Sequence, residues 1–189
     1  MQFGSVLHPD TQCLSRRGFI SGLASAVGLL AVSPVVASVV PAVQRALTFY
    51  HTHTGERAEI VYWRDGEYLA DRLQALDHLL RDHRTGEQTQ MDRGLLDLLY
   101  TLQLSLGEPG EFEIISAYRS PKTNQMLRSN SPGVAKRSLH MQGKAIDIRL
   151  CSCDLKRLRS CALSLKAGGV GYYPKSNFIH VDTGRVRYW

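Results

Sequence analysis

Two short segments near the end of the sequence carry histidine and aspartate where strands would normally carry apolar residues. In the segment SLHMQGKAIDIRL, His140 comes before Asp147, which interrupts an alternating apolar run. In the segment FIHVDTG, His180 and Asp182 are two positions apart, so on a strand they face the same side. Two imidazoles and one carboxylate form a normal ligand set for catalytic zinc, with the fourth position left to water. His140, Asp147 and His180 are therefore candidate ligands for one zinc ion.

Such a site predicts hydrolysis. Zinc lowers the pKa of a bound water to near neutrality and makes it a nucleophile. The metal also accounts for Asp147, because a carboxylate buried in a strand is unfavourable without compensation and favourable beside a divalent cation. In the alternative interpretation, His140 and Asp147 only hydrogen-bond to each other. The spacing does not choose between the two.

The rest of the chain predicts the elements that must position these side chains. Periodic leucines and turn residues predict helices over 69–83, 91–107, a short stretch from Pro121, and 153–169. Asp92 is the expected N-cap of the second helix, and Gly107 is its expected end. Strands are predicted over 47–56, 59–68, 111–120, 144–150, 169–174 and 177–184. This order predicts an α+β fold with a small central antiparallel sheet flanked by helices.

The first 42 residues have the layout of an export signal. The segment SRRGFI places paired arginines before a stretch, Phe19 to Val43, that has no charged residue. This layout resembles the twin-arginine class of signals, with Ala37 or Ala42 as the cleavage position. Gly, Ser and Pro interrupt the stretch, which disfavours a buried helix, whereas an uncleaved membrane anchor stays possible. We expect a signal over 1–42 and a periplasmic domain over 43–189, with membrane contact only through an uncleaved signal.

The net charge of +6 favours acidic partners, but the 23 Lys and Arg residues are scattered along the chain. No dense basic run and no basic stripe interleaved with aromatics is present, so a nucleic-acid partner is not expected. A diffuse positive surface suits a polyanionic matrix such as a cell wall.

The exported part carries an odd number of cysteines: Cys151, Cys153 and Cys161. An oxidising compartment allows one disulfide with one thiol left over, and the sequence does not choose the pair.

Four further histidines are not expected to bind metal. His51 and His53 lie in a short predicted strand and are interpreted as surface or structural. His78 and His83 lie on the polar part of a predicted helix and are interpreted as solvated.

The pattern Ser-x-His-x-x-Gly-x-Ala-x-Asp in SLHMQGKAID, with FIHVD downstream, resembles the lysostaphin, D-Ala-D-Ala metallopeptidase and hedgehog superfamily of zinc peptidases. The blocks LTFYHTHTGE, YWRDGEY, LLRDHRTGE, ISAYRS and GGVGYYP…FIHVDTGRVRYW more closely resemble exported YcbK-type murein endopeptidases. The resemblance implies a hedgehog- or D-Ala-D-Ala-peptidase-like fold. It also implies peptidoglycan as substrate, with D,D- or L,D-endopeptidase action on cross-links, among them those that join diaminopimelate residues.

The resemblance also assigns roles to single residues. His140, Asp147 and His180 match the zinc ligands, and Gly143 matches a small residue needed for a tight turn between ligands. Arg119 matches an arginine that approaches the substrate, where its fixed charge and forked donors suit a carboxylate or a scissile carbonyl. Tyr118 and Ser138 match neighbouring positions, as weaker candidates for substrate binding or oxyanion stabilisation.

The sequence departs from the family pattern at the general base. Many relatives place a glutamate or histidine two or three residues before the last ligand, where this chain has Asn177 and Phe178. Asp182 is then the candidate base, or alternatively a residue that orients a ligand. The missing base also keeps open a different class of function, a zinc-stabilised wall-binding module without turnover.

Overall fold

The computed structural model describes residues 43–107, 110–131 and 133–189. The predicted export signal, residues 1–42, lies outside this part of the chain. The described residues all fall within one unit, Val40–Trp189. None of the helices described has both the length and the apolar character that crossing a bilayer requires.

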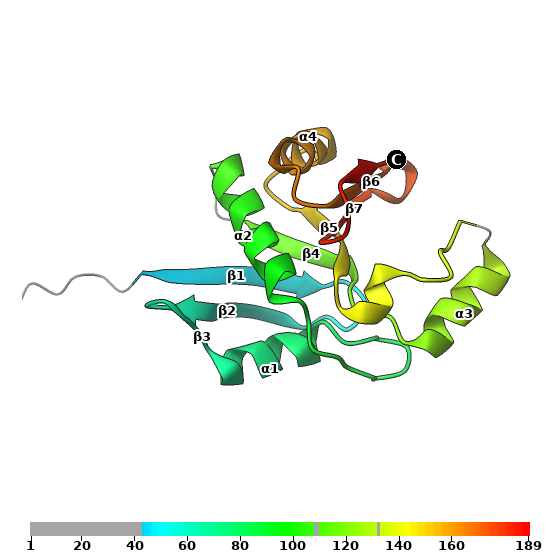
Figure 1. Cartoon of the computed structure of the whole chain (residues 1–189), viewed down its shortest axis with the longest axis horizontal. Helices are drawn as coiled ribbons and strands as arrows, with labels where there is room; N and C mark the ends of the chain where they lie inside the picture. The colour runs from blue at the N-terminus through cyan, green and yellow to red at the C-terminus, as the bar shows by residue number, and fades with distance from the viewer. Residues whose placement is uncertain (1–42, 108–109, 132) are drawn as a thin grey trace, which may run out of the picture. The chain divides into compact units, whose positions relative to one another are not determined.

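Strands and helices together give the α+β class that the sequence predicts (Figure 1). The strands are β1 (Gln44–His51), β2 (Arg57–Arg64), β3 (Glu67–Tyr68), β4 (Glu111–Ser116), β5 (Ala145–Leu150), β6 (Gly169–Tyr173), β7 (Phe178–Asp182) and β8 (Arg187–Tyr188). The α-helices are α1 (Ala70–Leu79), α2 (Arg93–Leu106), α3 (Pro121–Asn130) and α4 (Leu155–Leu165). The described residues also form two short 3₁₀ helices, η1 (Leu139–Gln142) and η2 (Pro174–Ser176).

The strands form one 8-stranded sheet in the order β3-β2-β1-β4-β5-β7-β6-β8. Most neighbours are antiparallel, but β1 pairs with β4 in parallel, and so does β6 with β8. The prediction of a small antiparallel sheet is therefore wrong in both size and strand direction. Parallel neighbours need a crossover connection, which α1 and α2 provide between β1 and β4. Hydrophobic periodicity identifies strand residues but does not record which strands become neighbours.

One hydrophobic core lies between the sheet and the helices. Helices α2 and α4 pack against each other, and α4 also contacts β5, β6 and β7 (Figure 1). Leu95 and Leu99 of α2 are fully buried in the same cluster as Phe49, Phe112 and Ile146 of the sheet. Burying each such side chain contributes about 1.5–3 kcal/mol. This packing fixes β5 and β7, the two central strands that carry predicted ligands.

The ends of the helices follow local capping chemistry. The Asp92 side chain accepts a hydrogen bond from the Gly94 N–H (3.0 Å), and Gly107 ends α2 in the left-handed conformation, which confirms both predictions. Helix α4 instead ends at Leu165, with Lys166 as its C-cap, before the paired glycines. Those glycines serve close packing, because a Cβ on Gly168 would overlap the carbonyl of Asp182.

Within the described part of the chain, Cys151 and Cys161 are free thiols. The Cys151 thiol donates a hydrogen bond to Glu113 (3.0 Å), and this bond raises its pKa to about 11. A thiol with so high a pKa is a poor nucleophile near neutral pH.

His51, His53 and His83 form a cluster at the C-terminal end of β1. Helix α1 ends at Leu79, so His83 lies in the following loop and not on a helix as predicted. Its ring stacks on His53, with centroids 4.0 Å apart and an interplanar angle of 12°. His51 is buried and its Nδ1 accepts hydrogen bonds from the His53 and Thr54 N–H groups (3.2 and 3.3 Å). His51 is therefore a neutral, structural residue with its proton on Nε2.

This cluster predicts an acid-sensitive loop. Burial and the neighbouring positive charges lower the pKa of His83 from 6.5 to about 4. Between these two pH values the unfolded chain binds more protons than the folded chain. The contribution of His83 to the free energy of unfolding is therefore fully present above pH 6.5 and is lost as the pH falls towards 4. Lowering the pH from about 7 to about 5 should destabilise the wild type by about 1 kcal/mol more than His83→Gln, after allowance for solvent screening. Urea denaturation at the two pH values measures the difference. His78→Gln, on the exposed side of α1, is the matched control and should behave like the wild type; equal acid sensitivity in His83→Gln would contradict the prediction.

Candidate metal centre

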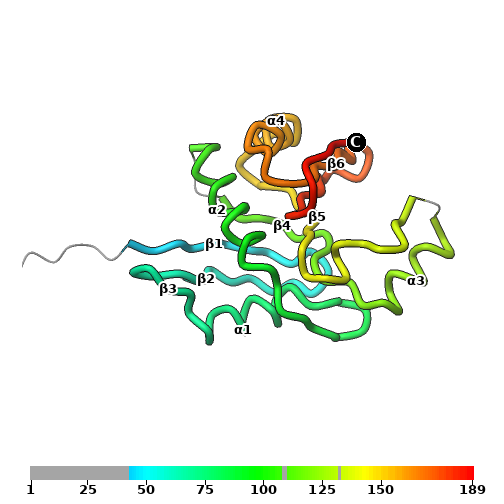
Figure 2. Tube along the Cα trace, in the orientation of Figure 1, coloured from blue at the N-terminus to red at the C-terminus, as the bar shows by residue number. Residues whose placement is uncertain are grey.

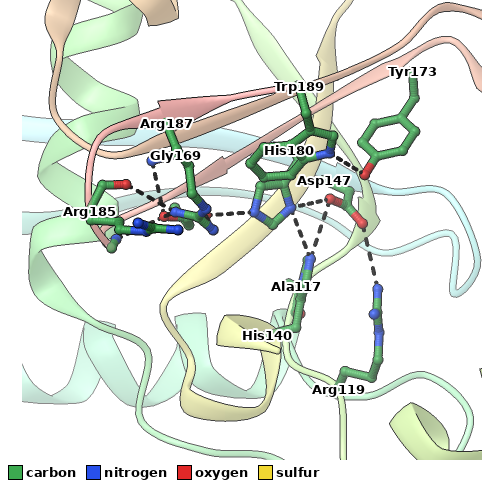
Figure 3. Close-up of polar contacts among 12 residues, drawn as sticks. Ala117, Arg119, His140, Asp147, Gly169, Tyr173, His180, Arg185, Arg187 and Trp189 are labelled. Carbon is green, nitrogen blue, oxygen red and sulfur yellow. Dashed lines mark hydrogen bonds and ion pairs between the residues drawn. The ribbon is translucent and has the colours of Figure 1, made fainter. Parts of the chain in front are cut away.

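Three neighbouring elements bring the predicted ligands together. Asp147 on β5 and His180 on β7 are directly opposite each other in the antiparallel register. His140 lies in η1, which the chain reaches on its return from α3 towards β5 (Figure 2). The three side chains converge in the close-up view (Figure 3).

The distances among the converging atoms suit one small cation. His140 Nε2 lies 3.2 Å from His180 Nδ1 and 3.3 Å from Asp147 Oδ1. His180 Nδ1 lies 2.8 Å from Asp147 Oδ1. Tetrahedral zinc with bonds of about 2.0–2.1 Å places its ligand atoms about 3.3 Å apart. The three atoms thus form one face of a tetrahedron of nearly the right size.

The hydrogen bonds on the far sides of the two rings fix where their protons lie. His140 Nδ1 is 2.7 Å from the Ala117 carbonyl oxygen, which only accepts, so the proton of neutral His140 is on Nδ1. His180 Nε2 is 2.9 Å from Asp182 Oδ2, which places the proton of His180 on Nε2. Both inward-facing nitrogens then present lone pairs towards a carboxylate oxygen. With its proton on Nδ1, neutral His140 has no proton on Nε2 to donate to Asp147, so the two cannot form a simple hydrogen bond. A cation between the two ring nitrogens and the carboxylate oxygen would be bound by all three atoms.

Charge and burial agree with this assignment. His140, Asp147 and His180 are all buried. Burial alone would raise the pKa of Asp147, but the two histidines lower it well below its usual range, so the carboxylate stays charged. Burial alone would lower the pKa of His180, whereas its hydrogen bonds to Asp147 and Asp182 raise it above the ordinary histidine value, so a proton and a metal cation compete for Nδ1.

Asp182 is not placed as a general base would be. Its side chain is 0% exposed, and its Oδ1 accepts hydrogen bonds from the N–H groups of Gly169 (3.0 Å) and Gly184 (2.8 Å). Burial would raise the pKa of Asp182, but its hydrogen bond to His180 and the pairing of Arg187 with both carboxylate oxygens hold this pKa far below its usual range. Asp182 is also absent from the lining of the cleft. The geometry argues against the predicted role as base and agrees with the alternative, a residue that orients His180.

Gly143 shapes the turn between the first two ligands. It ends η1 in the left-handed conformation (φ 66°), and its carbonyl accepts a hydrogen bond from the Asp92 N–H (2.9 Å). A Cβ at this position would lie 2.5 Å from the Gln90 carbonyl oxygen. The tight turn predicted at Gly143 is present, and only glycine fits it without strain.

Gly143→Ala should therefore lower the free energy of unfolding by about 2 kcal/mol, because it adds left-handed strain to a backbone clash. The shift in ligand geometry should also weaken zinc binding. Thermal unfolding and zinc titration measure the two effects. Gly133→Ala is the matched control, because a Cβ there meets only the Ser131 hydroxyl at 3.9 Å. Wild-type values for Gly143→Ala would contradict this account of the turn.

The ligands lie on the wall of a cleft of about 480 Å³. Arg119 and Ser138 line the same cleft, as expected of substrate-binding residues. Arg119 Nη2 is 3.6 Å from Asp147 Oδ2, and its buried Nε has no partner among the described residues. Ser138 is the N-cap residue of η1, but its hydroxyl makes no capping hydrogen bond. Tyr118 is not part of the cleft and packs instead against the hydrophobic core.

The structure adds aromatic residues that sequence reasoning missed. Tyr173, Phe178 and Trp189 also line the cleft. The Trp189 indole N–H donates to the Tyr173 hydroxyl (2.8 Å), and its ring lies 5.3 Å from the ring of His180 (Figure 3). The aromatic residues in the GYYP and RVRYW segments were the sequence signal that could have predicted this aromatic side of the cleft. Its position depends on the parallel pairing of β6 with β8, which the sequence does not reveal.

The fold and the site together define an α+β domain with a possible three-ligand metal centre at a cleft, an arrangement typical of metal-dependent hydrolases. The chain belongs to the family described as peptidoglycan L,D-endopeptidase MepK (Peptidase M15_2), which matches residues 40–189.

Curated relatives extend over nearly the whole chain. The peptidoglycan L,D-endopeptidase MepK of Escherichia coli K12 is 41% identical over 170 residues, which cover 90% of this chain and 93% of that protein. A probable MepK of Haemophilus influenzae is 45% identical over 171 residues, with 90% and 91% covered. No solved structure matches the chain significantly.

Proposed function

We propose that this chain is a zinc-dependent peptidoglycan endopeptidase that cleaves L,D cross-links. The observation that carries the proposal is the convergence of two imidazole lone pairs and one carboxylate oxygen at the cleft, within a family described by that activity. The names of the relatives favour L,D over D,D specificity. Zinc at this site would supply Lewis-acid activation of water and of the scissile carbonyl.

The chain's own residues bind and orient the substrate. Arg119 forms an ion pair with Asp147 Oδ2 (3.6 Å) and lines the cleft, where its guanidinium can meet a substrate oxygen. The Tyr173 hydroxyl accepts the Trp189 N–H, so its own proton is available to a substrate oxygen. Ser138 offers a second hydroxyl in the same cleft. Asp182 keeps His180 in the tautomer that presents Nδ1 inwards.

The test uses purified protein with zinc on two sets of peptidoglycan sacculi, one rich in L,D cross-links and one in D,D cross-links. Chromatography of the products should show loss of cross-linked dimers only in the first set. Intact L,D dimers after prolonged incubation would reject the proposal. Cleavage of both sets to the same degree would reject the specificity alone.

A wall-binding module without turnover is the second candidate. It is favoured by one observation: among the described residues that line the cleft, no glutamate and no histidine other than the ligands is present. Co-sedimentation with sacculi that releases no soluble peptide would support this candidate. Release of peptides at substoichiometric protein would exclude it.

We also propose that residues 1–42 direct export by the twin-arginine route to the periplasm. The paired arginines Arg16 and Arg17 before an uncharged stretch support this proposal. Replacing both with lysine should leave the protein in the cytoplasm, measured by cell fractionation. Unchanged export would contradict it.

A further inference from the structure

Arg187 forms a forked contact behind the metal centre. Its Nη1 donates to Asp182 Oδ1 (3.0 Å) and its Nη2 donates to Asp182 Oδ2 (2.6 Å). Nη1 also donates to the backbone carbonyl of Arg185 (3.0 Å), which fixes the guanidinium from a second side. Figure 3 shows Arg187, on β8, next to Gly169 and facing the ring of His180. Parallel double hydrogen bonds of this type fix the geometry of a carboxylate as well as its charge.

The Asp182 carboxylate is thereby fixed in one orientation. Oδ1 is held by two backbone N–H groups and by Arg187, and Oδ2 is shared between Arg187 and His180 Nε2. Rotation of the carboxylate would break the fork with Arg187 and the bond to His180 together. Packing supports this arrangement, because a Cβ on Gly169 would overlap both the Arg187 guanidinium and the Asp182 carboxylate.

We propose that Arg187 is a positioning residue for the metal centre. It acts through Asp182, which holds the ring of His180 so that Nδ1 faces His140 and Asp147. Without Arg187 the carboxylate gains freedom, and the His180 ring can tilt away from the common point of the three ligands. The inference rests on the proposed function in one respect, that the three ligands bind zinc.

Two other roles for Arg187 make different predictions. Arg187 lines the cleft, so it could bind substrate, and it lies over the Trp189 ring (5.1 Å), so it could only tether the end of the chain. A substrate anchor would affect KM and not the affinity for metal. A tether would affect unfolding and not depend on Asp182. A positioning residue affects the zinc affinity, and only while Asp182 is present.

The experiment measures the zinc Kd of the purified full chain by competition with a chromophoric chelator. Arg187→Ala should weaken zinc binding by about 10–100-fold, the usual effect of losing an outer partner of a metal ligand. Arg187→Lys, which keeps the charge but not the fork, should recover only part of this loss. Arg185→Ala is the matched control, because the Arg185 side chain is exposed and only its backbone carbonyl contacts Arg187. The zinc Kd of this variant should stay within about twofold of the wild type.

A double-mutant comparison tests whether Arg187 acts on zinc binding through Asp182. In an Asp182→Asn background, Arg187→Ala should add less than about threefold, because two residues in one chain of contacts are not additive. At saturating zinc, the KM for cross-linked muropeptides should be unchanged in Arg187→Ala, and urea unfolding of the variant confirms that it is folded.

Three results would overturn the inference: a wild-type zinc Kd in Arg187→Ala, the same loss with and without Asp182, or a change in KM alone. Failure of the proposed function is distinguishable, because it would appear as no zinc binding by the wild-type chain, and the inference would then fall with it.

Discussion

Replacing His140 with alanine should abolish hydrolysis of cross-linked peptidoglycan, with kcat/KM lower by at least about a thousandfold. Loss of an outer partner of a metal ligand costs about 10–100-fold, and loss of a ligand must cost more. The remaining pair would also close the site, because His180 Nδ1 and Asp147 Oδ1 are already 2.8 Å apart and can hydrogen-bond directly once a proton replaces the cation. Quantitative release of muropeptides measures the activity, and the metal content of the dialysed protein measures the cause.

Two comparisons keep this result interpretable. His78→Ala removes an imidazole from the exposed side of α1, where the side chain is 62% exposed, and should retain full activity and zinc. Asp147→Asn keeps the shape of a ligand but removes its charge, so it should lose zinc in a protein that still folds. Activity and zinc content equal to the wild type in His140→Ala would eliminate the proposed centre.

Arg119→Ala has the second largest expected effect, a fall in kcat of about a hundredfold or more, comparable to the loss of an oxyanion-stabilising donor. The Arg119 guanidinium is mostly buried at the cleft, and its Nη2 donates to the Ser116 hydroxyl (3.3 Å) and faces Asp147. Burial lowers the pKa of Arg119, but arginine remains charged at any physiological pH. Because Arg119 lines the cleft, the charge of its guanidinium can stabilise a substrate oxygen there. Initial rates on purified L,D-linked muropeptide dimers measure kcat and KM separately.

The matched control is Arg137→Ala, because Arg137 is exposed and lines the same cleft. Its loss changes the net charge of the cleft equally but removes no donor beside Asp147. Arg119→Lys should recover little activity, since an ammonium cannot reach both Asp147 and the substrate in a fork. If Arg137→Ala and Arg119→Ala were equally impaired, general electrostatic attraction would explain the effect and the specific role of Arg119 would fail.

Local chemistry made several features predictable. Asp92 and Gly107 define α2 because a cap and a left-handed stop act over a few residues. The ligand candidates were recognisable for a similar reason, since Asp147 and His180 each interrupt an apolar strand. Gly143 was predicted through the resemblance to the family motif, and the structure gives the reason, a turn that requires a positive φ.

The role of Asp182 was the part of the site that the sequence predicted least well. Asp182 shares a strand face with His180, and this spacing alone suggested a side chain open to the substrate. In the structure, its surroundings come from β6 and β8, which provide Gly169 and Arg187. Those contacts bury the carboxylate, and they depend on strand pairing across the sheet.

The sequence by itself determined which side chains have the chemistry of a hydrolase, since ligand type, cap residues and strand alternation are properties of neighbouring positions. Only the tertiary structure decided how these side chains are used. The pairing of β5 with β7 places Asp147 opposite His180, and the parallel pairing of β6 with β8 brings Arg187 to Asp182 and Trp189 to the cleft. The physical reason is that strand pairing is selected by burial of the whole core, a sum over distant residues that no local pattern contains.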